Sequence, residues 1–124
     1  MRLVYAAFIL LLLMASAQCQ QTAEDWYNKG TTLGIQGKYD EAIKAFDEAI
    51  WLNPNFADAW SNKGVALAGQ GKYDEAIKAY DEAIRFDPNP AMAWTNKGAS
   101  LGFLGRYVES LACLDKVRRS NRSL

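Results

Sequence analysis

Apolar residues recur every three or four positions from residue 23 onward, which is the period of an α-helix with one buried face. In residues 39–52, Tyr39, Ala42, Phe46 and Ala49 fall on one side of such a helix, and the charged residues fall on the other. Glycine and proline interrupt the pattern at regular intervals, where they favour helix ends. The pattern therefore predicts six helices, at residues 23–36, 39–52, 57–70, 73–86, 91–104 and 107–119.

The six predicted helices form three pairs, because the pattern repeats with a period of 34 residues. Residues 23–56 and 57–90 are identical at about 22 of 34 positions, and residues 91–124 follow the pattern less closely. A fixed period of this length is typical of solenoids, in which each unit buries its apolar face against the next. About three units are needed for a stable array, so the sequence predicts a short array of modest stability.

Certain residues stand at the same offset in successive repeats, and they carry a resemblance to a known family. They are Trp26, Gly30, Tyr39, Ala42, Phe46 and Pro54 in the first repeat, Trp60, Gly64, Tyr73, Ala76, Tyr80 and Pro88 in the second, and Trp94, Gly98 and Tyr107 in the third. The pattern resembles the tetratricopeptide repeat (TPR) family over the whole chain after residue 22. The resemblance implies an all-α fold, an α-solenoid of three helix–turn–helix repeats at 23–56, 57–90 and 91–124 that form a short right-handed superhelix.

A glycine recurs in the middle of each first helix, at Gly30, Gly64 and Gly98. Glycine within a helix costs about 1 kcal/mol relative to alanine. Its recurrence predicts that the two helices of a repeat approach closely at this point. In the central repeat we expect Trp60 and Tyr80 to be the most costly truncations, about 3–5 kcal/mol each if their side chains are fully buried.

The third repeat departs from the pattern of the first two. Ser110 and Leu114 replace the small residue and the aromatic, Arg118 stands where Ile50 and Ile84 stood, and Arg122 replaces the proline. Terminal repeats of solenoids are atypical and more polar on their outer side. We interpret residues 91–124 as a degenerate, capping repeat, and simple decay of the last repeat is the alternative.

The N-terminal residues have a different composition. Arg2 precedes an unbroken apolar run from Leu3 to Met14, and Ala15-Ser16-Ala17 follows. These features are typical of a secretory signal peptide, and the run is shorter than the roughly 20 residues of a membrane span. We expect a signal peptide at 1–17, a tail at 18–22 and a secreted or cell-surface protein. The main alternative is an uncleaved anchor, which is the membrane attachment that we would expect if there is one. A lipoprotein modified at Cys19 is a weaker alternative, because Gln18 stands where a small residue is expected.

Charge and cysteine content narrow the classes of partner. The 14 basic and 14 acidic residues cancel, so the composition predicts no nucleic-acid partner. Residues 23–90 carry 7 basic and 12 acidic residues, whereas residues 91–124 carry 6 basic and 2 acidic residues.

The chain has two cysteines, Cys19 and Cys113. An oxidising compartment would permit a disulfide between them. Because Cys113 stands where the other repeats have alanine, we interpret it as a small packing residue.

The sequence offers no recognisable catalytic or metal-binding set. It contains no histidine, no cysteines at zinc-binding spacing and no glycine-rich phosphate loop. The recurring Asp-Glu pairs lie on the polar face of each second helix, where they favour the helix N-terminus. We therefore expect no enzyme activity, no metal and no cofactor.

The face of each first helix opposite its Trp-Gly-Leu stripe differs from repeat to repeat. The resemblance implies that this face lines a concave groove that binds a protein or peptide. The candidate groove residues are Glu24, Tyr27, Thr31 and Ile35 in the first repeat, Asp58, Ser61 and Val65 in the second, and Met92, Thr95 and Phe103 in the third. Family members that hold a C-terminal carboxylate use lysine, arginine and asparagine along this groove. At the matching positions only Asn62 agrees, and the others are Tyr27, Thr31, Met92 and Asn96.

Two hypotheses follow for the function. The leading one is an exported, non-catalytic scaffold or adaptor that binds a protein or peptide in its groove. The alternative is a structural module that stacks head to tail into a homo-oligomer, since the acidic front and the basic back of the array have opposite charges.

Overall fold

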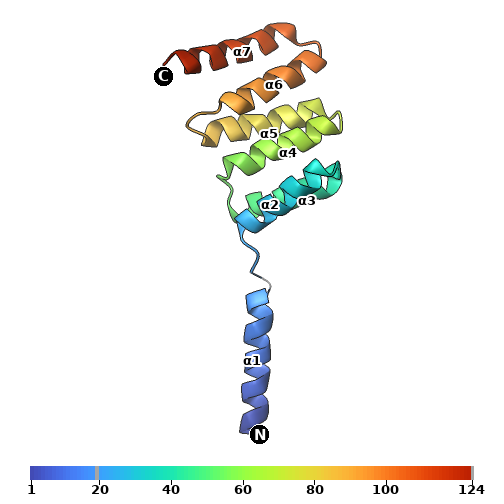
Figure 1. Cartoon of the computed structure of the whole chain (residues 1–124), viewed down its shortest axis with the longest axis vertical. Helices are drawn as coiled ribbons and strands as arrows, with labels where there is room; N and C mark the ends of the chain where they lie inside the picture. The colour runs from blue at the N-terminus through green and yellow to red at the C-terminus, as the bar shows by residue number, and fades with distance from the viewer. Residues whose placement is uncertain (19, 124) are drawn as a thin grey trace.

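The computed structural model describes residues 1–18 and 20–123, with the backbone alone for residues 15–18. The described residues form seven helices, shown in Figure 1: α1 (Arg2–Gln18), α2 (Ala23–Ile35), α3 (Tyr39–Leu52), α4 (Ala57–Gly69), α5 (Tyr73–Phe86), α6 (Ala91–Phe103) and α7 (Tyr107–Arg122). The six helices predicted after residue 22 are confirmed. The largest difference is at the end of α7, which continues to Arg122.

Helices α2–α7 stack in chain order (Figure 1). The closest pairs are α2 with α3, α4 with α5, and α6 with α7, and α3 packs on α4 as α5 packs on α6. Every helix–helix contact in the described part of the chain joins two of these six helices. The all-α solenoid that the repeat pattern predicted is therefore confirmed.

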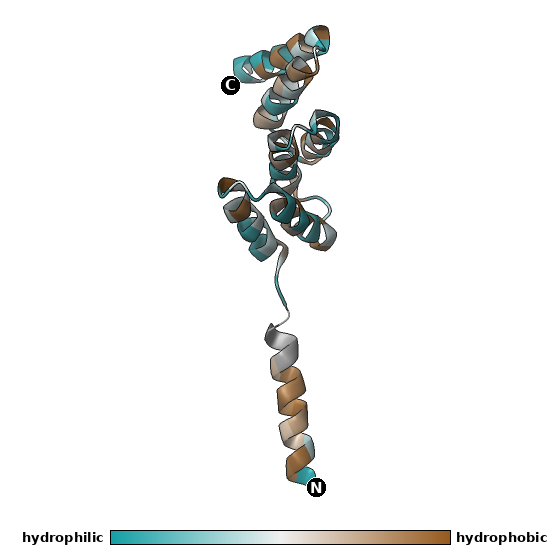
Figure 2. Cartoon of the chain, turned by 90° about the vertical axis from the view of Figure 1, so that its right-hand side faces the viewer, coloured by the Kyte–Doolittle hydropathy of each residue, from teal (hydrophilic) through white to brown (hydrophobic). Residues whose placement is uncertain are grey.

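Helix α1 projects from the α2 end of the stack, and Figure 2 shows that its middle is strongly hydrophobic. It includes the whole apolar run from Leu3 to Met14 and continues to Gln18, the first residue of the predicted tail. Thr22, the last residue of that tail, caps α2, and Cys19 lies outside the described residues. In the portion of the chain with coordinates, no helix combines the length and apolar character needed to cross a membrane.

Local sequence sets the helix ends. Thr22 begins α2 with a capping box. The Asp25 amide donates to the Thr22 hydroxyl at 3.1 Å, and the Thr22 amide donates to the Asp25 carboxylate at 3.0 Å. At the other end of α2, Gly37 has a φ of 76°, a left-handed conformation that favours glycine. The amides of Gly37 and Lys38 donate to the carbonyls of Gly34 and Leu33, which is the Schellman pattern. Equivalent bonds follow α4 and α6, so the predicted glycine stops are confirmed.

The recurring mid-helix glycines lie where the two helices of a repeat approach most closely. A Cβ atom at Gly64 would lie 2.5 Å from the Tyr80 ring, and one at Gly30 would lie 2.7 Å from the Phe46 ring. At Gly98 the nearest atom is the Cβ of Cys113, at 3.3 Å. The close approach predicted from the sequence is thus confirmed, and it is tightest where an aromatic ring faces the glycine.

The largest buried side chains are those of the central packing positions. Tyr80 and Phe46 are each 2% exposed, and Tyr80 packs in one cluster with Leu67, which Trp60 borders from a partly exposed position. The Trp60 indole also donates to the Pro54 carbonyl at 2.9 Å. The predicted cost of about 3–5 kcal/mol depended on full burial. Tyr80 meets this condition and Trp60 does not, since Trp60 is only partly buried.

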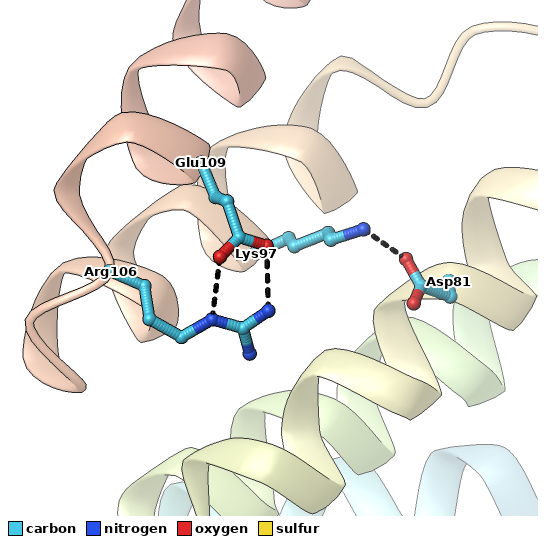
Figure 3. Close-up of polar contacts among 4 residues, drawn as sticks. All are labelled: Asp81, Lys97, Arg106 and Glu109. Atoms are coloured by element: carbon cyan, nitrogen blue, oxygen red, sulfur yellow. Dashed lines mark hydrogen bonds and ion pairs between the residues drawn. The ribbon is translucent and has the colours of Figure 1, made fainter.

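Ion pairs tie each repeat to the next on the side where the tryptophans lie. Lys63 Nζ lies 2.6 Å from Asp47 Oδ1, and Lys97 Nζ lies 2.5 Å from Asp81 Oδ1 (Figure 3). The two lysine side chains are only 23% and 20% exposed, so their aliphatic stems also pack against the array.

A hydroxyl pair distinguishes the second repeat junction from the first. Phe46 packs with Ala66 at the first junction, whereas the equivalent residues at the second are Tyr80 and the buried Ser100. The Tyr80 hydroxyl is hydrogen-bonded to the Ser100 side chain. Burial raises the pKa of Tyr80 to about 12, an effect that the bond to Ser100 partly opposes.

This raised pKa predicts a loss of stability in alkali. The unfolded chain ionises the Tyr80 phenol near its ordinary pKa of 10.0, whereas the folded chain keeps the proton up to about 12. The stabilising contribution is therefore fully present below pH 10.0 and is lost as the pH rises through about 12. The free energy of unfolding should fall by about 1.4 kcal/mol per pH unit in this window, as measured by urea unfolding at a series of pH values. Tyr80→Phe should remove this part of the slope, and an unchanged slope in that variant would contradict the assignment.

The end of the array differs from the prediction of a polar cap. The first half of α7 exposes Tyr107, Val108, Leu111 and Leu114, and basic residues are confined to its second half. Arg106, just before α7, pairs with Glu109 at 2.6 Å (Figure 3). The predicted polar outer face is thus corrected for the first half of α7, where apolar residues of the repeat pattern are exposed. A capping role for the third repeat stays a prediction.

Cys113 occupies a packing position within the third repeat. It is free, 4% exposed and clustered with Ile77 and Leu101. Burial raises the pKa of its thiol. This placement fits the interpretation of Cys113 as a small packing residue, while its predicted alternative partner Cys19 lies outside the described residues.

Candidate functional site

Two hollows lie along the side of the array formed by the first helices of the repeats. The first has a volume of about 340 Å³ and lies between α2, α3 and α4. The second has a volume of about 330 Å³ and lies between α4, α5 and α6. Val65 lines both, so the two hollows are adjacent, and we call the surface that they form the groove. The first is lined by Thr31, Gly34, Ile35, Tyr39, Phe46, Asn62, Val65, Ala66 and Gly69, and the second by Val65, Ala68, Tyr73, Tyr80, Asn96, Ala99, Ser100 and Phe103.

The two hollows are built from equivalent positions of the repeat but differ at one of them. At this position the first hollow has Gly69, which has no side chain. A Cβ atom added to Gly69 would lie 2.7 Å from the Tyr39 ring. At the equivalent Phe103 the second hollow has a large ring, which stacks on Tyr73 with centroids 5.0 Å apart and planes at 9°. The Phe103 side chain remains 72% exposed. The groove therefore has a tyrosine ring packed against a glycine at one end and an exposed aromatic platform at the other.

A small polar network borders the first hollow. Asn62 Nδ2 donates to the Tyr27 hydroxyl at 3.2 Å and to Thr31 Oγ1 at 3.4 Å. Thr31 Oγ1 in turn donates to the Tyr27 carbonyl at 3.0 Å. The Tyr27 ring packs against Phe56, with centroids 5.0 Å apart. Tyr27 is consequently a packing residue whose hydroxyl orients Asn62, rather than a free anchor.

The structure brings together only some of the residues predicted for the groove. Thr31, Ile35 and Val65 line the first hollow, and Val65 and Phe103 line the second. Ile35 is 84% exposed and Val65 is 47% exposed. The remaining predicted residues line neither hollow: Glu24, Tyr27, Asp58, Ser61, Met92 and Thr95.

Sequence reasoning missed the residues that the second helices contribute. Tyr39 and Phe46 from α3, and Tyr73 and Tyr80 from α5, form walls of the hollows. The spacing of these four residues is that of a buried helix face, so it predicts a packing role and gives no sign that they also line the groove. Asn62 was noticed only for its match to carboxylate-binding relatives, and its bonds to α2 were not predicted. Its recurrence as Asn28, Asn62 and Asn96 at one offset was the available signal.

The groove is apolar with scattered neutral hydrogen-bonding groups. None of the residues lining the two hollows is charged. The Asn62 amide group donates to Tyr27 and Thr31 and leaves its Oδ1 as an acceptor. Asn96 adds a second side-chain amide, and both groups suit the backbone of a bound peptide. Among the residues that the structure describes, no group of three or more His, Cys, Asp or Glu side chains is placed to hold a metal ion. The groove is thus suited to binding by apolar contact and neutral hydrogen bonds.

Comparisons with known proteins agree with this architecture. A model of the family described as Tetratricopeptide repeat matches residues 20–94, and no curated protein sequence matches the chain. Among solved structures, the chain is similar to a crystal structure of MamA at 27% identity and a TM-score of 0.80. That match covers 82% of this chain but only 60% of the MamA chain.

Two further structures are similar to this chain and contain a bound partner. The TPR2B-domain:pHsp70 complex of yeast Sti1 is 29% identical, with a TM-score of 0.79 and 82% of each chain covered. The second TPR of Spaghetti (RPAP3) bound to the HSP90 peptide SRMEEVD is 27% identical, with a TM-score of 0.75, and the match covers 83% of this chain and 95% of that one. The matched family model spans more than half of the residues, and the helix pairs repeat with its period. The chain therefore belongs to the tetratricopeptide repeat family.

Proposed function

We propose that this protein is an exported, non-catalytic scaffold that binds a protein or peptide segment in the groove. The observation that carries the proposal is the pair of adjacent apolar hollows, which leave Ile35, Val65 and Phe103 exposed on one surface of the array. Apolar side chains gathered in a concave, rigid surface are typical of recognition sites. The binding of peptides by two similar TPR structures supports the same use of the fold.

The uncharged lining favours a particular class of segment. A peptide with a strongly acidic end, such as SRMEEVD, would find no lysine or arginine in either hollow. Burial of its carboxylates without a cationic partner would cost several kcal/mol. Glu24 and Asp58, both exposed near the starts of α2 and α4, add negative charge on the first helices. The partner that fits best is a neutral or basic segment with apolar side chains.

Export rests on the composition of the N-terminus. The positively charged Arg2, the apolar run and the A-x-A sequence have the form of a signal peptide. The groove lies entirely within residues 31–103, so its composition does not depend on the removal of residues 1–17. The partner would then be met outside the cytoplasm, at the cell surface or in the secreted fraction.

A matched pair of variants tests the groove. Short random peptides are selected against residues 20–124, and the affinity of the selected peptides is measured by fluorescence anisotropy. Val65→Glu places a charge between the two hollows and should weaken binding by more than about tenfold. Val108→Glu makes the same change on the outer face of α7 and should leave affinity unchanged, because Val108 is 83% exposed and lines neither hollow.

The selected sequences provide a second readout. We expect neutral or basic peptides with two or more apolar residues, and no measurable binding of SRMEEVD at the same concentrations. Equal loss of affinity in both variants, or tight binding of SRMEEVD, would contradict the proposal. Circular dichroism of both variants checks that the helices are retained.

A further inference from the structure

We propose that the two ends of the array bind each other, so that α7 of one copy packs on α2 of the next copy, head to tail. The proposal concerns the ends of the stack and shares only Ile35 with the groove. It applies to residues 20–124, since α1 projects from the α2 end (Figure 1). Three contacts join one repeat to the next inside the chain, and the residue types that make each contact recur at the two ends of the stack, where they make no contact of this kind within one copy.

The first contact is between large side chains beside the groove. Inside the chain, Tyr73 stacks on Phe103 of the following repeat at 5.0 Å. Tyr107 occupies the position of Tyr73 one repeat later and is 69% exposed. Ile35 occupies the position of Phe103 in the first repeat and is 84% exposed. Stacking two copies would place Tyr107 against the partner's Ile35.

The second contact is in the core of the junction. Inside the chain, Ile77 is buried in one cluster with Leu101 of the following repeat. Leu111 stands at the position of Ile77 in the last repeat and is 65% exposed. Leu33 stands at the position of Leu101 in the first repeat and is only partly buried, whereas Leu101 is 1% exposed. A second copy would bury both leucines as an internal junction does.

The third contact is the ion pair that recurs between repeats. Lys97 and Asp81 form it at the second junction (Figure 3). Asp115 has the aspartate's position in the last repeat, and Lys29 has the lysine's position in the first. Lys29 already lies over the ring of its neighbouring tryptophan at 4.8 Å, as Lys97 does at 5.3 Å. It is therefore oriented like a lysine that crosses a junction.

Charge replacements at the two ends have opposite signs. Asp25 takes the position held by the buried Ala59 and Ala93, and Arg118 takes the position held by Ile50 and Ile84. In one copy Asp115 pairs with Arg118 at 2.6 Å and with Arg119 at 2.8 Å. The two arginine side chains are 61% and 75% exposed, so these pairs rearrange at little cost. Acidic residues at the front and basic residues at the back would attract each other and fix the direction of stacking. Because the two faces are different, the contact is heterologous and can repeat from copy to copy, which produces chains or rings of copies.

A charge exchange tests this pairing. Lys29→Asp and Asp115→Lys should each weaken the association of residues 20–124 by about tenfold, as measured by sedimentation velocity over a range of concentrations. The double variant carries the pair reversed at every junction, so its association should recover to within a few-fold of the natural chain. Failure of the double variant to recover, with both single variants folded, would overturn the pairing.

A second pair of variants separates stacking from other association. Leu111→Glu should prevent association and leave residues 20–124 monomeric. Ala112→Glu should leave association unchanged, because the residues at the same position in the first two repeats, Lys44 and Lys78, stay exposed when the next repeat packs on them. Association that both variants retain, or a natural chain that is monomeric at all concentrations, would overturn the proposal. The monomeric outcome would instead support a capping role for the third repeat. Neither result changes the peptide test of the groove, which rests on Val65.

Discussion

Replacing Tyr80 with alanine is expected to unfold most of the array, with a loss of about 3–5 kcal/mol of stability. Tyr80 is 2% exposed, its ring lies against the backbone of Gly64, and its hydroxyl bonds to Ser100. Alanine would leave a cavity in the central repeat and an unpaired buried hydroxyl. A domain of this size has a total stability on the order of 5–15 kcal/mol, and three repeats are close to the minimum for an array. The effect is measured by urea unfolding followed by circular dichroism.

The comparison with Tyr80→Phe separates packing from hydrogen bonding. Phenylalanine occupies the equivalent position 46 in the first repeat, so its ring should fit, and the loss should be about 1 kcal/mol from the bond to Ser100. Adding Ser100→Ala reproduces the Phe46–Ala66 pair of the first junction and should recover most of that loss. A Tyr80→Ala variant as stable as Tyr80→Phe would contradict the central place of this ring in the core.

Gly64→Ala is expected to destabilise the protein by about 2 kcal/mol, although alanine is the better helix former. The added Cβ atom would lie 2.5 Å from the Tyr80 ring, which is itself fixed in the core. The two helices must move apart, and the strain exceeds the roughly 1 kcal/mol that alanine gains in a helix. Thermal unfolding of the purified variant gives the measurement.

Gly34→Ala is the matched control for this prediction. Gly34 is also inside a first helix, but nothing lies within 4 Å of an added Cβ atom. Here only the helical preference acts, and a gain of about 0.5–1 kcal/mol is expected. If both variants were stabilised, the close approach of α4 and α5 would not limit the residue at position 64.

The helices were predictable because their signals are local. Glycine at residues 37, 71 and 105 and the apolar period of three to four positions mark the same boundaries that the backbone hydrogen bonds show. The close helix contact at Gly64 was also predictable, since an unfavourable residue recurs there without a local reason. The pairing of repeats followed from the 34-residue period, which requires each unit to pack on the next.

The groove was predictable only as a face of the first helices. Helical spacing places Glu24 and Met92 on the same side as Ile35. Whether each of these residues lines a hollow depends on how the side chains of the second helices pack against the first helices. The two ends of the groove differ because the Tyr39 ring packs against Gly69, whereas the Tyr73 ring stacks on Phe103. Such contacts join residues about 30 positions apart, and no local pattern reports them.

The outer face of α7 shows the limit of reasoning from substitutions alone. Arg118 and Arg122 suggested a polar cap, yet Leu111 and Leu114 keep the apolar character of an internal repeat and are 65% and 49% exposed. The polarity of a helix face depends on the residues of every turn, and the arginines of α7 lie only between residues 118 and 122. Counting replaced positions therefore missed the apolar surface that the first turns of α7 present.

The central claim is that the groove holds the partner, and it is tested most directly by mapping the bound surface. Residues 20–124 labelled with nitrogen-15 are titrated with a selected neutral peptide, and the amide chemical shifts are followed by NMR. The account predicts that the largest changes lie at Thr31, Ile35, Val65, Ala99 and Phe103, which line the two hollows. Changes confined to the opposite side, around Trp26, Lys44 and Trp60, or to the outer face of α7, would show that the partner binds elsewhere and would contradict the account.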